Sequence, residues 1–181
     1  MSAVMPRRGL LACCAAAAAT AVALPLAGCA AVPETPPQAN LITLNQQAAD
    51  ALLQGGHLDP RQPLLVAAFV NLDMLTESSR LGRLFSEQVA GRLANRGYPV
   101  VELKLRDNLF FKQGQALLLS QEVREVSQVH QAQAVVVGTY TASPNTLYVS
   151  LKLVATPGSI ILAAHDYAVP MDANVRGLLA R

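Results

Sequence analysis

The sequence lacks tryptophan, is poor in other aromatic residues, and confines its cysteines to its beginning. Phe and Tyr together make up 4% of the 181 residues. This scarcity argues against a surface that stacks nucleic-acid bases. The three cysteines are Cys13, Cys14 and Cys29. The chain beyond Cys29 therefore has no residues for a disulfide, a cysteine zinc site or a cysteine nucleophile.

Charge is also scarce, and the formal net charge of +2 does not belong to the main part of the chain. Arg7 and Arg8 stand in the first ten residues, and no acidic residue precedes Glu34. Removing those two arginines from the 14 basic residues leaves 12 beyond Gly28, against 12 acidic residues. A basic surface for nucleic acid or anionic lipid therefore has no support in the overall charge.

Motifs for catalysis or cofactor binding are missing as well. We find no Walker motif, GxGxxG, GxSxG or HExxH in the sequence. The three histidines are expected in a loop, a helix and a strand, as solvated or packed side chains (His57, His130, His165). Glu102, Glu122 and Glu125 are acid–base candidates only in the sense that any surface carboxylate is. We expect that the protein is not an enzyme and that it binds no metal and no cofactor.

The first 28 residues have the layout of a bacterial signal peptide. Arg7 and Arg8 form a short positive region, and an apolar run follows from Leu10 to Leu26. This run is slightly short for a membrane span, which needs about 20 residues. The alternative is an ordinary transmembrane helix followed by a chance cysteine.

The apolar run ends in a lipobox, Leu26-Ala27-Gly28-Cys29. Small residues give a peptidase access to the backbone before Cys29, whose thiol takes a diacylglyceryl group. The freed amine can then take a further acyl chain such as palmitate. Several chains make a stable anchor, because one chain binds a membrane only marginally. Ala30 follows the cysteine, and the sorting rule of lipoproteins then favours the outer membrane.

Residues 29–40 are predicted to be a stiff tether, because Pro33, Pro36 and Pro37 stand close together. The following chain predicts one α/β domain at 41–170 and a C-terminal tail or short helix at 171–181. Helices are expected at 40–54, 79–96 and 121–131. Strands are expected at 64–70, 98–105, 134–140, 147–154 and 160–169, with a long connection at 106–119. The order predicts a helix and then β-α-β-α-β-β-β in a mixed five-stranded sheet, with the last three strands antiparallel.

Two details of the second predicted helix concern its glycines. Gly82 and Gly91 fall near its inner face by helical spacing, and close approach to the sheet would explain both. Gly97 is expected to end the helix in a left-handed conformation.

One pair of residues offers a second kind of binding. Asp73 and Arg80 are seven residues apart, a separation at which OmpA-like domains place two side chains to grip the peptidoglycan stem peptide. An arginine fork suits a carboxylate because it donates two parallel hydrogen bonds. The residues between them, Thr76-Glu77, depart from that motif.

The chain resembles the FlgO domain over about residues 41–170. The resemblance is carried by 66–73, 78–88, 96–103 and 138–140, and its motif residues are Arg80, Gly82, Arg83, Gly97, Tyr98, Glu102, Gly138 and Tyr140. The family often has charged partners in the stretch before the third strand. Here amides stand in their place, in Gly114-Gln115 and Ser120-Gln121.

The resemblance implies a non-enzymatic outer-membrane lipoprotein of the periplasmic face, with a fold similar to the N-terminal domain of TolB. It implies envelope protein partners, among them the outer rings of the flagellar basal body, and hence a role in motility. Phe110 and Phe111 lie in the predicted 106–119 loop, where we expect any exposed apolar patch.

Two other functions stay open. Outer-membrane lipoproteins of similar fold regulate cell-wall synthases, but a tether of about ten residues reaches only ~35 Å, which disfavours contact across the wall. A small-ligand-binding lipoprotein is the other function, and the absence of tryptophan and of a polar cluster weakens it.

Overall fold

Helix α1 (Leu41–Gly55) lies within one residue of the predicted range at each end. The Asn40 side chain caps it by accepting a hydrogen bond from the Thr43 backbone N–H at 3.1 Å. The structure is a computed structural model, and it describes residues 38–75, 77–103, 110–113, 116–119, 121–156 and 158–180. In 110–113, 116–119 and 121–122 it describes the backbone alone. All described elements lie in one compact unit, Pro36–Arg181.

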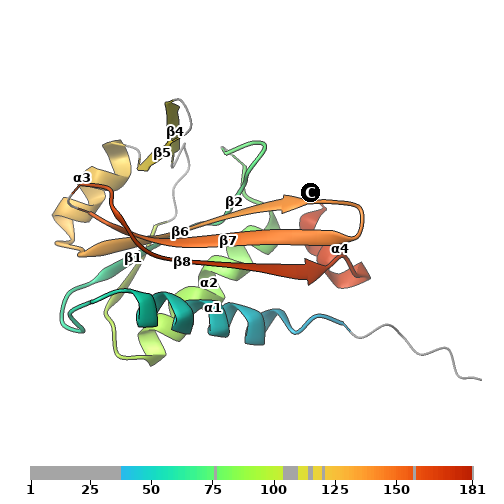
Figure 1. The fold of residues 1–181 in the computed structure, drawn as a ribbon, viewed down its shortest axis with the longest axis horizontal. Helices are drawn as coiled ribbons and strands as arrows, with labels where there is room; N and C mark the ends of the chain where they lie inside the picture. The colour runs from blue at the N-terminus through green and yellow to red at the C-terminus, as the bar shows by residue number, and fades with distance from the viewer. Residues whose placement is uncertain are drawn as a thin grey trace, which may run out of the picture. The chain divides into compact units, whose positions relative to one another are not determined.

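The main sheet is mixed, with the strand order β3-β1-β6-β7-β8 (Figure 1). Strands β1 (Leu64–Ala67), β3 (Val100–Leu103) and β6 (Ala134–Ala142) are parallel. Strands β7 (Thr146–Ala155) and β8 (Ile161–Pro170) follow β6 in antiparallel pairing. The sequence predicts all three features: the α/β class, the mixed sheet and the antiparallel pairing of the last three strands.

The predicted strand 64–70 is interrupted. After β1 the chain leaves the ladder at Ala68 and Phe69, and it rejoins β6 as the short strand β2 (Val70–Asn71). Val66 lies opposite Val136, and Val70 lies opposite Thr139. The chain from Val66 to Val70 therefore advances four residues where β6 advances three. The extra residue is a bulge, which a continuous apolar run cannot reveal.

Helix α2 (Arg80–Asn95) crosses between β2 and β3, and both of its ends are capped. The Ser79 hydroxyl accepts from the Gly82 N–H at 3.1 Å. At the other end Gly97 has a φ of +91°, and its N–H and that of Tyr98 donate to Ala94 and Leu93. This is the Schellman geometry, so the predicted glycine stop is found. The prediction for Gly91 was wrong, because it is exposed and a β-carbon there would contact nothing within 4 Å.

The remaining elements agree with the expectation only in part. Residues within the predicted 106–119 loop form an antiparallel hairpin of β4 (Phe110–Gln113) and β5 (Ala116–Leu119). Helix α3 (Gln121–Val129) buries Val123 and Ser127, and it ends before His130, which was expected in this helix and is exposed. The C-terminal segment forms helix α4 (Ala173–Leu179), whose Val175 is fully buried in the core.

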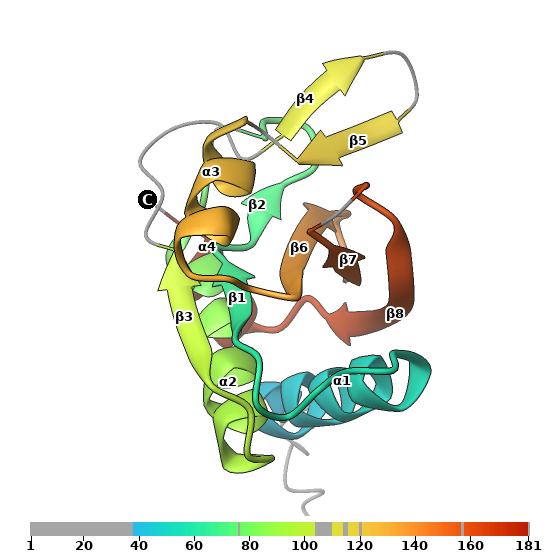
Figure 2. The ribbon, with the colours of Figure 1, turned by 90° about the vertical axis from the view of Figure 1, so that its left-hand side faces the viewer.

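The helices cover the two faces of the sheet unequally (Figure 2). Helices α1 and α2 pack on one face over the larger apolar core, which includes Phe69, Phe85 and Leu151. Helix α3 covers part of the other face, where Val123 packs with residues such as Leu65 and Val135 of β1 and β6. Toward β8 that second face has no helix over it in the described part of the chain.

Helix α1 is joined to its neighbours by polar contacts as well as by apolar packing. The Asp50 carboxylate accepts two hydrogen bonds from each of two α2 arginines, Arg92 (3.0 and 2.6 Å) and Arg96 (2.8 and 2.7 Å). The fully buried Asn45 accepts from the Tyr167 hydroxyl of β8 and donates to the Gln88 side chain of α2 at 2.7 Å. Burial raises the pKa of the Tyr167 hydroxyl, so it stays a donor.

Candidate functional site

The open half of the second face is built by the alternation of three strands. In β7 the side chains of Leu147, Val149, Leu151 and Leu153 are buried toward α1 and α2. The alternate residues Tyr148 and Ser150 therefore point to the opposite face. No helix of the described chain covers them, and they form the floor of a groove.

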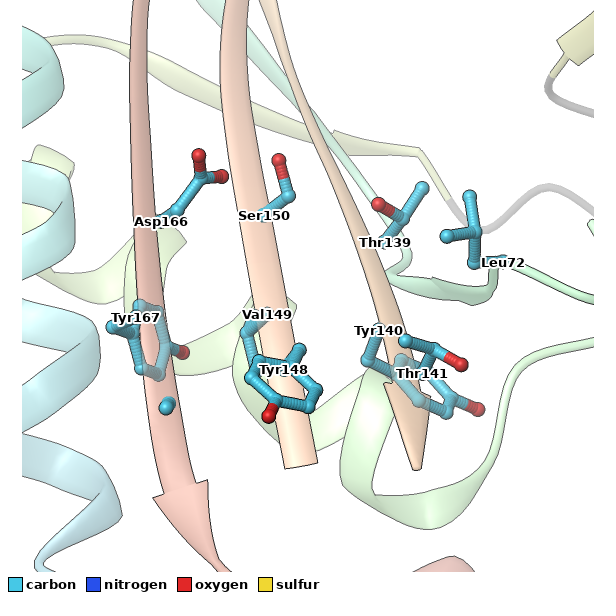
Figure 3. Close-up of a pocket in the computed structure, with 10 residues that line it drawn as sticks. Leu72, Thr139, Tyr140, Thr141, Tyr148, Val149, Ser150, Asp166 and Tyr167 are labelled. Atoms are coloured by element: carbon cyan, nitrogen blue, oxygen red, sulfur yellow. The ribbon is translucent and has the colours of Figure 1, made fainter. Parts of the chain in front are cut away.

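Strand register arranges the groove in two rows. Thr139 of β6, Ser150 of β7 and Asp166 of β8 are directly opposite one another. Two residues further along β6 and β7, Thr141 pairs with Tyr148, which in turn pairs with Ala168 of β8. Figure 3 shows Asp166, Ser150 and Thr139 abreast on neighbouring strands, with Leu72 beyond them and Tyr148 further along β7. The groove has a volume of about 480 Å³.

The groove combines exposed apolar surface with one negative charge. Tyr148 is 54% exposed and Leu72, from the loop after β2, is 48% exposed. Asp166 is exposed, and among the described residues that line the groove it is the only Asp, Glu, Lys, Arg or His. A second carboxylate lies at the rim, where Asp73 accepts a hydrogen bond from the Thr141 hydroxyl at 3.3 Å. The arrangement suits binding of a partly apolar, positively charged group.

The described side chains bring together no group of three metal-ligating residues. His57 is exposed in the loop before β1, and His130 is exposed after α3. His165 lies in β8 beside Tyr167, with ring centroids 6.2 Å apart. Glu102 is exposed on β3, and Glu125 is exposed on α3. Among the described residues, these sequence candidates are therefore spread over separate elements.

Several motif residues of the FlgO resemblance meet around Phe69. A β-carbon at Gly138 would lie 2.3–2.4 Å from three ring carbons of Phe69, and one at Gly82 would lie 2.3 Å from the Phe69 carbonyl oxygen. The Ser78 hydroxyl donates to that same oxygen at 2.8 Å. The glycines thus let α2 and β6 close on the interrupted strand, and their role here is packing.

Tyr140 joins this packing from the end of β6. Its hydroxyl accepts a hydrogen bond from the Ser79 N–H at 3.0 Å, next to the first turn of α2. Its ring is 4% exposed. The Leu72 N–H donates to the Tyr140 carbonyl at 2.8 Å, which holds the loop that carries Leu72 at the groove.

Arg80 and Arg83 each hold backbone carbonyls. Arg80 donates to Gly177 (2.7 Å) and Ala180 (3.1 Å) of the C-terminal segment. Arg83 donates to the Ser78 carbonyl at 3.2 Å. Asp73 meets Thr141 instead of Arg80. The two side chains that an OmpA-like peptidoglycan contact would use are therefore engaged separately, and the sequence already departs from that motif.

Some predicted site residues cannot be placed. Leu26, Ala27, Gly28 and Cys29 lie outside the described residues, as do Gly114, Gln115 and Ser120. The backbone of Phe110 and Phe111 pairs with Leu119 and Leu118 in the β4–β5 hairpin. Their side chains lie outside the described part of the structure, so the apolar patch expected there stays a prediction.

The groove was not predicted from the sequence, although one signal was present. Residues 147–154 alternate, and the non-buried set Tyr148, Ser150 and Lys152 marks a solvent-facing side. The exposure of that side depends on α3 covering the sheet only partly. The alternation alone does not contain that information.

Comparison with known proteins assigns a family and a fold. A family model described as FlgO protein matches residues 46–174. No curated protein matches the chain. None of the helices in the described part of the chain is long and apolar enough to span a membrane.

The solved structures that match the chain share little sequence identity with it, and those with a TM-score above 0.5 show its fold. The LpoB C-terminal domain from Salmonella enterica is 16% identical, with a TM-score of 0.55 over 72% of this chain and 98% of that one. The LpoB C-terminal domain from Escherichia coli is 14% identical, with a TM-score of 0.52 over the same shares. The PelC dodecamer from Paraburkholderia phytofirmans is 14% identical, with a TM-score of 0.46 over 64% of this chain and 76% of that one.

Proposed function

The chain belongs to the FlgO family, as its sequence predicts, and we propose that it is a lipid-anchored, non-enzymatic interaction protein of the bacterial envelope. Its α/β domain binds a protein partner through the open face of β6, β7 and β8. The observation that carries this proposal is the groove on that face, lined by the exposed side chains of Leu72, Tyr148 and Asp166.

The composition of the groove favours a protein partner. Tyrosine is enriched in protein interfaces, because it offers a large apolar area together with a polar tip. Tyr148 and Leu72 supply that area, and Ser150 and Thr139 add hydroxyl groups for orientation. The residues that line it come from three neighbouring strands and the loop after β2, so they form a surface that can receive a side chain or loop.

The sequence supports the anchor. Cys29 ends the lipobox, and the proline-rich residues up to Asn40 separate it from the domain. The tether joins the domain at a fixed place, because the Ala39 N–H donates to the Asp172 carboxylate at 3.2 Å. Asp172 also caps α4 through the Val175 N–H at 2.7 Å. The proposed location is the periplasmic face of the outer membrane.

Within this function, we place the partner at the outer rings of the flagellar basal body. The family resemblance supports this choice. Regulation of a cell-wall synthase is the alternative, since outer-membrane lipoproteins of similar fold have that role. Both functions use the same anchored domain, and the identity of the partner separates them.

Crosslinking in cells tests the proposal. A photoreactive amino acid at position 148 should crosslink to a specific envelope protein. The same residue at position 87 is the control, because Glu87 is exposed on α2 in the opposite layer. Equal products from both positions, or none from position 148, would reject docking at this face.

Isolation of basal bodies then tests the finer assignment. A tagged chain should be enriched with basal bodies that retain their outer rings. A crosslink to a cell-wall synthase, with no enrichment in basal bodies, would instead favour the alternative.

A further inference from the structure

We propose that the groove receives an arginine side chain of the partner, held between the Asp166 carboxylate and the Tyr148 ring. This inference rests on the proposed docking face and specifies the chemistry of its partner. It assigns Asp166, Tyr148 and Ser150 as the residues that recognise the cation.

The first argument is the charge of the groove. Asp166 is exposed and makes no ion pair in the described part of the chain. Asp73 adds a second negative charge at the rim through its contact with Thr141. No cation is among the described residues that line the groove. A partner that covers this surface must bring a positive charge, or it leaves a carboxylate desolvated without compensation.

Lys152 is the cation on the same face of β7, and its position leaves the site open. It lies two residues beyond Ser150, on the side away from Tyr148, and it does not line the groove. It is not within ion-pair distance of Asp166. Lys152 weakens the negative potential but does not occupy the space between Asp166 and Tyr148.

The second argument is the spacing of the two groups. Tyr148 is directly opposite Ala168, so Asp166 is its diagonal neighbour on β8. Diagonal neighbours of an antiparallel pair are about 7 Å apart. A cation that stacks on an aromatic ring lies within about 6 Å of the ring centre. The N–H groups of an arginine donate to a carboxylate oxygen at about 2.8 Å. A guanidinium group that lies between the two side chains is large enough to make both contacts once the Asp166 carboxylate turns toward the ring.

The third argument favours arginine over lysine. A guanidinium is planar, stacks on aromatic faces and donates several hydrogen bonds in fixed directions. The hydroxyl of Ser150 lies beside Asp166, and that of Thr139 is next in the row. Both hydroxyl oxygens can accept hydrogen bonds from the guanidinium N–H groups that do not bind the carboxylate. A lysine ammonium is compact and cannot reach the ring and both acceptors together.

The experiment titrates a defined probe into the chain from residue 29 onward, with Cys29→Ser, which keeps the whole compact unit Pro36–Arg181. The probe is N-acetyl-arginine amide, and its neutral counterpart is N-acetyl-citrulline amide. We expect the arginine probe to shift the NMR amide signals of Tyr148, Ser150 and Asp166 in a saturable manner. Citrulline should bind at least fivefold more weakly.

Three variants test which charged side chains affect binding of the arginine probe. Asp166→Asn keeps the shape of the side chain and should weaken arginine binding roughly fivefold. Lys152→Gln should strengthen it about twofold, because a nearby positive charge is removed. Glu87→Gln removes a carboxylate from the other layer and should change nothing. Equal binding of both probes, or arginine binding unchanged in Asp166→Asn, overturns the inference.

The same variants separate this inference from the proposed function. If the crosslink from position 148 persists undiminished in Asp166→Asn, docking at the face stands and the arginine assignment falls. If no crosslink forms although the arginine probe binds as expected, the docking function falls. Loss of the crosslink in Asp166→Asn, but not in Glu87→Gln, supports both.

Discussion

The Phe69 ring lies directly against Gly138, at a distance that leaves no room for a β-carbon. Three ring carbons of Phe69 are 2.3–2.4 Å from the place that such a carbon would occupy. Phe69 is fully buried at the bulge between β1 and β2, and it contacts the Phe85 ring of α2 edge-on at 6.1 Å. The glycine therefore fixes where the interrupted strand crosses β6.

Replacing Gly138 with alanine should destabilise the domain by about 3 kcal/mol, because the Phe69 ring must move within a packed core. Urea unfolding monitored by circular dichroism measures the loss. Gly91→Ala is the matched control. Its added methyl group meets open space on α2, so that variant should gain about 1 kcal/mol. If Gly138→Ala leaves the stability unchanged, the Phe69 ring can adopt another position in the core.

Tyr140→Phe should cost about 1 kcal/mol of stability. The variant keeps the buried ring and removes the oxygen that accepts from the Ser79 N–H. Ser79 also caps α2, so the amide protons of the first turn should exchange faster with solvent. Exchange measured by NMR would show this effect at α2 and leave α1 unchanged. Uniform acceleration in both helices would contradict a local role.

Asp50→Asn should destabilise the domain by about 1 kcal/mol at neutral pH, since the pair of arginine forks loses its charged acceptor. Hydrogen bonds from Arg96 and Arg92 hold the pKa of Asp50 well below its usual range. The carboxylate therefore stabilises the folded state above about pH 4, and this contribution is lost as the pH falls through the lowered pKa.

The difference in unfolding free energy between the wild type and Asp50→Asn should therefore shrink on acidification. Urea titrations at neutral pH and at steps below about pH 4 measure it. Glu87→Gln, which alters an exposed carboxylate on the same helix layer, is the control. A difference that is constant down to strongly acidic pH would show that the arginine contacts do not depend on charge.

Arg80→Ala should loosen the C-terminal helix without unfolding the domain. Arg80 donates to the Gly177 and Ala180 carbonyls from an exposed position, so we expect a local loss of about 0.5 kcal/mol. Hydrogen exchange of the α4 amides measures it, with Arg83→Ala as the control. Binding of Arg80→Ala to purified wall sacculi should equal that of the wild type. A loss of binding to sacculi in Arg80→Ala would instead support peptidoglycan binding through Arg80.

Cys29→Ser should release the protein from membranes, because no thiol remains to take the lipid. Fractionation of cells into soluble and outer-membrane material measures this change, and the folded domain should be unaffected. Cys13→Ser is the control, since that cysteine lies in the apolar run of the signal peptide. Retention of Cys29→Ser in the membrane fraction would contradict the proposed anchor.

The elements with strong local signals were predictable from the sequence. Asn40, Ser79 and Gly97 mark helix ends by their own chemistry, and the structure uses all three. The antiparallel order of the last three strands follows from tight turns of few residues. These features depend on residues close together in the chain.

The features that were missed depend on residues far apart. The bulge at Phe69 exists because Gly138 and Gly82 come from other elements and leave space for the ring and carbonyl. Gly91 is an exception: it stands nine residues after the buried Gly82, which at 3.6 residues per turn puts it on the opposite, exposed side of α2. The exposure of Tyr148 depends on where α3 lies, so a local pattern could not identify the groove.

The link between α1 and β8 also has a consequence for how the chain acquires its fold. Asn45 and Tyr167 form their hydrogen bond across 122 residues. During synthesis the first helix is therefore made long before the strand that completes its packing. Helix α2 covers part of the apolar stripe of α1, and the rest stays uncovered until β8 is made, which makes folding slow and dependent on the last strands. A chain truncated before β8 should accumulate as a substrate for chaperones and proteases.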